Sequence, residues 1–162
     1  MRLLRLLSCA LPVALAVLLP TFSPNAAAKD LPSDICSLLS QQQLQKTLGV
    51  AFGAAQKSSA PPAYRGQSAG TNCHYNEQKN GRKEVILIVY VDHSPDEAKQ
   101  TFEKLSFFYR PKSKPSGIGD SAYIDAQSAI HVLKGKVRYF INAGDVSEKQ
   151  IEALATAVAG QI

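Results

Sequence analysis

The spacing of apolar residues along the chain predicts several helices. Apolar residues at helical spacing indicate a short helix over 31–39 and a second one over 41–48, where Gly49 provides the stop. The same pattern predicts helices that begin at Ser94 and at Ser147. The second helix and these two later ones each follow a serine, whose side chain can cap free N–H groups of the first turn.

Between the helices, runs of apolar and β-branched residues predict strands. These are residues 50–55, 71–77, 84–92, 120–125, 129–134 and 136–142. Asn80-Gly81 predicts a tight hairpin turn between the second and third strands. Seven consecutive apolar residues over 85–91 indicate a strand buried on both faces, in the centre of a sheet. Residues 57–70 are rich in serine, alanine, proline and glycine and predict a loop.

The order of these elements predicts an α+β fold. Helix, three strands, helix, three strands and a last helix are most simply arranged as an antiparallel sheet of about five to six strands with helices on one face. Three well-capped helices disfavour a β-sandwich. Gly70–Tyr75 and Gly119–Tyr123 open corresponding strand pairs, which suggests a weak internal pseudo-repeat.

The first 28 residues have the pattern of a secretory signal peptide. Arg2 and Arg5 supply positive charge, residues 11–19 form an apolar segment, and Ala26–Ala28 forms a small-residue cleavage site. The apolar segment is shorter than the roughly 20 residues that a membrane-spanning helix needs. The sequence therefore predicts an exported protein, periplasmic or secreted, that is cleaved near Ala28.

Cys9 does not fit the position of a lipid anchor. A lipidated cysteine follows the apolar segment of its signal, whereas here most of that segment comes after Cys9. Membrane contact is therefore expected to be peripheral at most. A single domain over 29–162 remains, which keeps 134 of the 162 residues and has a formal net charge of +3 in place of +5. Export and this small charge argue against nucleic acid as a partner.

Two cysteines remain in the exported domain, Cys36 and Cys73. A cysteine pair in an exported protein predicts a disulfide. Closing a loop of about 37 residues contributes about 4 kcal/mol in the chain-entropy model. A redox pair or a zinc site is disfavoured, because the chain has no C-x-x-C motif and no matched pair of histidines.

Three segments of the chain resemble small bacterial cell-envelope proteins of unknown function. The resemblance rests on residues 36–49 (CSLLSQQQLQKTLG), on Cys73-His-Tyr75 and on residues 116–123 (SGIGDSAY). Many members of that group are actinobacterial lipoproteins, and this chain departs from them because it lacks a credible lipidation motif. The resemblance implies an α+β domain with its two cysteines bridged, and it implies no catalytic residue.

The histidines do not form a recognisable catalytic or metal-binding motif. No H-x-H, H-x-x-x-H or H-E-x-x-H spacing occurs, and neither G-x-S-x-G nor S-x-x-K is present. No catalytic residue, metal ligand or cofactor is therefore predicted. A small periplasmic hydrolase or metal-dependent enzyme that uses His74, His93 or His131 remains the alternative. His74 could approach His131 if their strands were neighbours.

The end of the third helix and the loop after it form the candidate binding site. If the helix buries its apolar stripe, Phe107 points outward, because a helix turns once in 3.6 residues. An outward phenylalanine beside a basic loop is suited to contact a partner or ligand. Alternatively, the helix ends early and both phenylalanines fold onto the core. The candidate contact residues are Phe107, Phe108, Arg110, Lys112 and Lys114.

These observations predict a non-enzymatic binding or interaction module of the cell envelope. Its partner would be an envelope protein or a small apolar ligand, bound through Phe107–Lys114 and a face of the sheet. The two hypotheses predict different structures. An enzyme requires a cleft in which titratable groups converge, whereas a binding module predicts an apolar hollow lined by aromatic rings.

Overall fold

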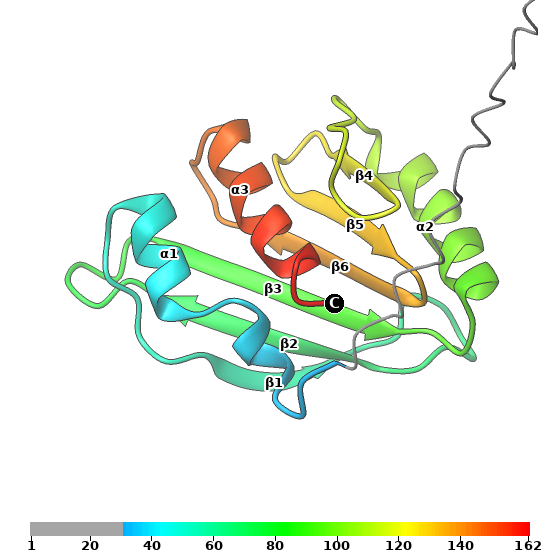
Figure 1. Ribbon diagram of the computed structural model, residues 1–162, viewed down its shortest axis with the longest axis horizontal. Helices are drawn as coiled ribbons and strands as arrows, with labels where there is room; N and C mark the ends of the chain where they lie inside the picture. The colour runs from blue at the N-terminus through cyan, green and yellow to red at the C-terminus, as the bar shows by residue number, and fades with distance from the viewer. Residues whose placement is uncertain (1–30) are drawn as a thin grey trace, which may run out of the picture.

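The computed structural model describes residues 31–162, which form one six-stranded sheet with three α-helices (Figure 1). The predicted signal peptide, Cys9 and the cleavage site at Ala26–Ala28 lie outside the described residues. Within residues 31–162, no helix is both long and apolar enough to cross a membrane.

The elements follow the predicted order of helix, three strands, helix, three strands and helix. A short 3₁₀ helix precedes the first α-helix. In chain order the elements are η1 (Ile35–Leu38), α1 (Gln41–Leu48), β1 (Gln56–Ala60), β2 (Gly70–Asn76), β3 (Glu84–Val91), α2 (Pro95–Tyr109), β4 (Ser121–Ile124), β5 (Ile130–Lys134), β6 (Val137–Asn142) and α3 (Glu148–Ala159).

Serine caps begin the three α-helices, as the sequence predicts. The hydroxyl of Ser40 accepts a hydrogen bond from the backbone N–H of Gln43 at 3.2 Å, and the Gln43 side chain accepts one from the Ser40 N–H at 2.7 Å. Ser147 begins α3 with the same reciprocal pair, and Ser94 caps α2. These bonds satisfy N–H groups that have no partner inside the helix.

The six strands are antiparallel and lie in the order β1-β2-β3-β6-β5-β4. The two halves of the chain therefore meet at the centre of the sheet, where β3 pairs with β6 and Leu87 lies opposite Ile141. This central position of β3 was predicted from its apolar run. Strands β2 and β5 are separated by two others.

One face of the sheet carries the main core, under η1, α1 and α3 (Figure 1). Alternate strand residues point to this face, as the pleat of a strand requires. The predicted apolar stripe of α3 is buried against them, which confirms the helical spacing. Its members are Ile151, Leu154, Ala155, Val158 and Ile162.

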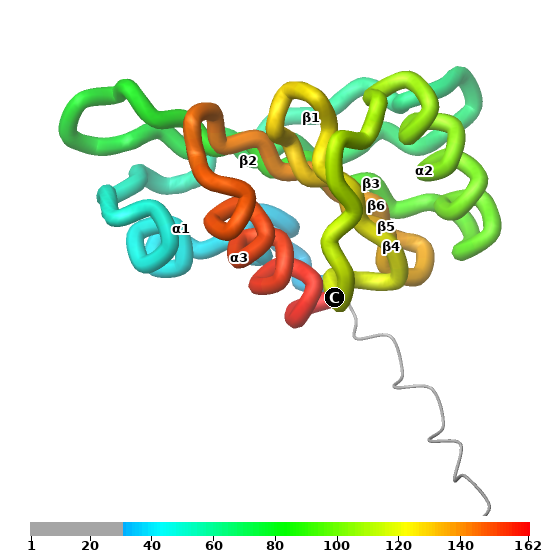
Figure 2. The backbone as a smooth tube through the Cα atoms, turned by 90° about the horizontal axis from the view of Figure 1, so that it is seen from above, coloured from blue at the N-terminus to red at the C-terminus, as the bar shows by residue number. Residues whose placement is uncertain are grey.

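Helix α2 packs against the opposite face of the sheet (Figure 2). Its Phe102 ring lies 5.0 Å from the ring of Tyr123, and Ala98 and Leu133 complete this smaller core. The predicted α+β class and the antiparallel sheet are confirmed. The expectation of helices on a single face holds for η1, α1 and α3 but not for α2, because Tyr123 and Leu133 place large apolar side chains on the second face.

The first strand lies later in the chain than predicted. The expected strand over 50–55 is instead an extended segment with one isolated bridge, between Phe52 and Glu77. Strand β1 occupies 56–60, and all but its first residue lie within the segment 57–70 that was predicted as a loop. Four of its five side chains are exposed, so no apolar alternation marks it. Its backbone pairing with β2 is what defines it.

The predicted disulfide is present and joins η1 to β2. Cys36 and Cys73 are bonded, with their Cα atoms 5.4 Å apart. The hydroxyl of Tyr75 donates a buried hydrogen bond to the carbonyl oxygen of Cys36 at 2.7 Å. The disulfide therefore ties η1 to the sheet beside the main core.

Candidate ligand cavity beside helix α2

A cavity of about 250 Å³ lies between α2, the second face of the sheet and the loop that follows β1. We call residues 61–69 of this loop the strap. An apolar cavity of about 150 Å³ is large enough for benzene, so this one, which is partly open to solvent, has room for one or two rings of a molecule that extends beyond it. Aromatic side chains dominate its wall: Tyr90, Phe102, Tyr109, Tyr123 and Phe140 line it, together with His131 and Arg138.

A row of stacked rings crosses three strands under α2. His131 of β5 lies directly opposite Tyr123 of β4 and Phe140 of β6 in the sheet register. The His131 ring is 4.6 Å from the Tyr123 ring at an interplanar angle of 13°, and 5.4 Å from the Phe140 ring at 18°. Tyr109 of α2 adds a fourth ring, 4.7 Å from His131. Such rings offer apolar surface and stacking partners to a bound ring.

His131 is held in this row by Asp125. Its Nε2 lies 2.9 Å from Oδ2 of Asp125, and the other carboxylate oxygen accepts the backbone N–H groups of Gln127 and Ala129. A carboxylate only accepts hydrogen bonds, so Nε2 carries the proton. Burial lowers the pKa of His131, and the hydrogen bond to Asp125 opposes this shift only in part. At neutral pH the ring is therefore uncharged.

Arg138 supplies the cationic group of the cavity wall, and its charge is neutralised by Asp92. The guanidinium Nε donates to Oδ2 of Asp92, and Nη2 donates to Oδ1 at 2.9 Å. Both side chains are buried. The guanidinium also lies over the Tyr90 ring, 5.0 Å from its centroid. Through this bidentate pair, the carboxylate of Asp92 neutralises the charge of Arg138 within the protein.

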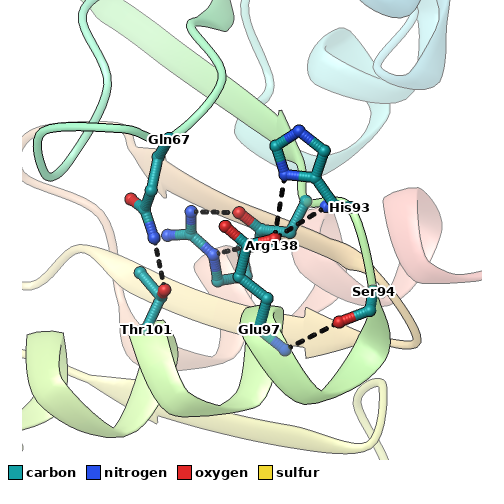
Figure 3. Close-up of polar contacts among 7 residues, drawn as sticks. Gln67, His93, Ser94, Glu97, Thr101 and Arg138 are labelled. Atoms are coloured by element: carbon teal, nitrogen blue, oxygen red, sulfur yellow. Dashed lines mark hydrogen bonds and ion pairs between the residues drawn. The ribbon is translucent and has the colours of Figure 1, made fainter.

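The strap forms one side of the cavity through Pro61, Pro62 and Ala63, and then reaches across to α2. Gln67 donates a hydrogen bond from Nε2 to the hydroxyl of Thr101 on α2 (Figure 3). The hydroxyl of Tyr90 donates to the carbonyl of Pro61 at 3.0 Å. Gly70 follows the strap, and a Cβ there would lie 2.8 Å from the Tyr90 ring. Glycine at this position therefore lets the ring keep its place in the wall.

Three buried polar atoms of the strap and the cavity wall have no hydrogen-bond partner among residues 31–162. They are the hydroxyl oxygens of Tyr64 and Tyr123 and the side-chain oxygen of Gln67, and each is buried. Burial raises the pKa of Tyr123, so its hydroxyl stays protonated and can donate as well as accept. Two of the three atoms belong to the strap, and the third stands in the row of rings.

The predicted contact residues do not line the cavity and do not form one cluster. The side chains of Phe107 and Phe108 are 82% and 67% exposed, with their ring centroids 5.8 Å apart, so neither folds onto the core. Arg110 ends α2 in the left-handed region, with φ of 52°. Lys112 pairs with Glu148 and Ser128, and Lys114 lines a second hollow, between α2 and β4.

The structure keeps the three histidines apart. His74 is on β2, His93 precedes α2 and His131 is on β5, and β2 and β5 are not neighbours. Each is paired with a different carboxylate: His74 with Glu84 at 2.6 Å, His93 with Glu97 at 2.9 Å (Figure 3) and His131 with Asp125. No group of three or more metal-ligating side chains gathers within the part of the chain that the structure describes.

Sequence reasoning did not identify the cavity residues as a site. Tyr90, Tyr123 and Phe140 stand in predicted strands, at alternating positions that face away from the main core. The one signal in the sequence was Arg138, a charged residue in the middle of an apolar strand, with Asp92 at the end of another. Buried charges are rare unless they are paired, so pairing these two residues could have located a polar feature on the second face.

Comparison with known proteins gives a likeness in fold. No family model matches the chain, and a search of curated proteins finds no relative. Among solved structures, the extracellular domain of PknH from Mycobacterium tuberculosis is similar, with a TM-score of 0.54 and 13% sequence identity. The match covers 77% of this chain and 92% of that chain. At this identity the likeness is one of fold.

Proposed function

We propose that this protein is an exported, non-enzymatic module that binds a small apolar ligand in the cavity between α2, the strap and the sheet. The observation that carries the proposal is the wall of stacked aromatic rings with no unpaired charged side chain among the described residues that line it. Ligand sites in proteins are concave and mostly apolar, with a few polar groups that fix orientation.

The shared fold with an extracellular domain supports the export part of this proposal, together with the signal-like N-terminus. Catalysis by the histidines is the less favoured function. His74, His93 and His131 stand on separate elements, and only His131 lines the cavity. There its ring is stacked between those of Tyr123 and Phe140 and bonded to Asp125, and no group of three or more metal-ligating side chains gathers there or elsewhere among residues 31–162.

The proposal is tested with N-phenyl-1-naphthylamine, an uncharged dye that fluoresces in apolar surroundings. Ala63 of the strap lines the cavity, so Ala63→Phe is expected to fill it and to abolish saturable binding. Ala54→Phe is the matched control, because Ala54 is exposed and lies outside the cavity wall. Saturable binding by the wild type and by Ala54→Phe, but not by Ala63→Phe, supports the proposal. No saturable binding by the wild type contradicts it.

A second contact is proposed at the exposed pair, Phe107 and Phe108, with Arg110, Lys112 and Lys114 beside it. The observation that favours it is the exposure of two adjacent rings, which soluble surfaces rarely present without a partner. The expected partner is an envelope protein. Pull-down from envelope extract with wild type and with Phe107→Ala tests it, and equal recovery of every partner by the two proteins would refute the contact.

A further inference from the structure

The hydroxyl of Tyr123 is a feature of the cavity that apolar binding leaves unexplained. The side chain is 2% exposed, and its oxygen has no partner among residues 31–162. Buried hydroxyls in proteins are nearly always hydrogen bonded, because an unmade bond costs the free energy of desolvation. The buried hydroxyls of Tyr75 and Tyr139, on the other face, each donate to a backbone carbonyl at 2.7 Å.

The surroundings of Tyr123 place this hydroxyl on the cavity side of α2. The ring stacks on His131 and packs against Phe102, and both of these line the cavity. The groups that act electrostatically on the hydroxyl include Tyr64 of the strap, Tyr109 of α2 and Arg138 of β6. Tyr123 lines both this cavity and the second hollow between α2 and β4, whereas Tyr109 and Arg138 line only this cavity, so the hydroxyl lies at the wall of this cavity.

The strap, whose Pro61, Pro62 and Ala63 line the cavity, carries two further polar atoms of this kind. Gln67 uses its amide nitrogen on Thr101, while its oxygen is buried without a partner among the described residues. The Tyr64 hydroxyl is also buried without a partner among the described residues. Neither Tyr64 nor Gln67 lines the cavity, so the group that can meet a ligand is the Tyr123 hydroxyl, which can donate or accept.

The charged side chain in the cavity wall is already paired, so the cavity does not require an ionised ligand. Arg138 is the one ionised side chain among the described residues that line the cavity, and Asp92 pairs with it through two hydrogen bonds. The neighbouring His131 is occupied by Asp125. A bound anion would therefore have to compete with Asp92, and a bound cation would lie beside Arg138 without a free carboxylate.

We propose that the cavity recognises an uncharged, planar ring molecule that carries a hydroxyl or carbonyl group, and that the Tyr123 hydroxyl is the hydrogen-bond partner of that group. The inference rests on the proposed function, since it names the class of ligand that the same cavity takes. The rings of Tyr109, Tyr123 and Phe140 hold the planar part, and the polar atom lies beside the Tyr123 hydroxyl.

The test compares two probes of equal shape, 2-naphthol and 2-methylnaphthalene, as competitors of N-phenyl-1-naphthylamine. Tyr123→Phe removes only the hydroxyl. We expect it to weaken 2-naphthol about tenfold relative to 2-methylnaphthalene, the effect of one hydrogen bond. The thermal midpoint should not fall, because the deleted group has no partner among the described residues. Tyr75→Phe is the matched control, since its hydroxyl is bonded far from the cavity, and it should leave the affinity ratio unchanged.

The outcomes separate this inference from the proposed function. If the wild type binds none of the probes, the proposed function fails. If the wild type and Tyr123→Phe bind both competitors with the same ratio, the cavity binds apolar rings but water alone serves the hydroxyl, and the inference is overturned. A lower ratio accompanied by a lower thermal midpoint, with the same change in Tyr75→Phe, would also overturn it, because the effect would then be structural.

Discussion

Replacing Asp92 by asparagine should expose the charge of Arg138 and change which probes the cavity accepts. Both side chains of the pair are nearly inaccessible, at 4% and 2% exposure, and Arg138 forms two hydrogen bonds to the carboxylate. Removing one partner of a buried ion pair costs about 3–5 kcal/mol, since the other charge stays buried. Asparagine keeps one acceptor, so we expect a loss near the lower limit, about 3 kcal/mol.

This loss is measured by urea denaturation followed by far-ultraviolet circular dichroism. A domain of this size is typically stable by about 5–15 kcal/mol, so Asp92→Asn should remain folded without denaturant. Asp96→Asn is the matched control, because Asp96 is an exposed residue in the first turn of α2. Loss of its interaction with the helix dipole should cost about 0.5 kcal/mol.

The same variant should shift the choice between a charged and an uncharged dye. The folded Asp92→Asn protein is expected to gain affinity for the anionic 1-anilinonaphthalene-8-sulfonate relative to N-phenyl-1-naphthylamine, because Arg138 is no longer neutralised. A loss of less than about 1 kcal/mol in the free energy of unfolding would show that the ion pair is more exposed to water than it is in the structure. An unchanged ratio of the two affinities would refute the argument that Asp92 sets the charge of the cavity.

Three further results are expected. Replacing Cys36 and Cys73 by serine should lower the free energy of unfolding by about 4 kcal/mol, the chain-entropy value for the 37-residue separation, as measured in urea. Tyr139→Phe should cost about 1 kcal/mol because its hydroxyl bonds to a carbonyl of α3, whereas Tyr123→Phe should cost nothing, as thermal melts of the two variants will show. Because the pKa of His131 is lowered in the folded protein, the unfolded chain binds more protons at this residue as the pH falls below 6.5. Urea titrations should therefore show the free energy of unfolding falling as the pH drops below 6.5. The fall should be less steep in His131→Gln.

Much of the fold could be predicted from local patterns. Ser40, Ser94 and Ser147 cap helices because each side chain serves N–H groups within its own turn, a short-range bond that the sequence displays directly. The apolar run of β3 predicted its central place for a similar reason. Strand β1 could not be found in this way, because its exposed side chains carry no periodic signal and its pairing partner is distant in the chain.

The candidate site was predicted only at its margin. Helix geometry left two alternatives for Phe107, outward or folded onto the core, and the structure has it exposed. The cavity depends on which face α2 covers and on the register that sets His131 between Tyr123 and Phe140. Neither is encoded within one segment of the chain, so local spacing could not bring these rings together.

The measurement that tests the central claim most directly is the set of intermolecular nuclear Overhauser effects between bound N-phenyl-1-naphthylamine and the ring protons of the protein. If the cavity beside α2 is the binding site, the dye protons will show contacts to Tyr90, Tyr109 and Phe140. Contacts confined to the exposed rings of Phe107 and Phe108, or the absence of any contact to the cavity rings, would contradict the account.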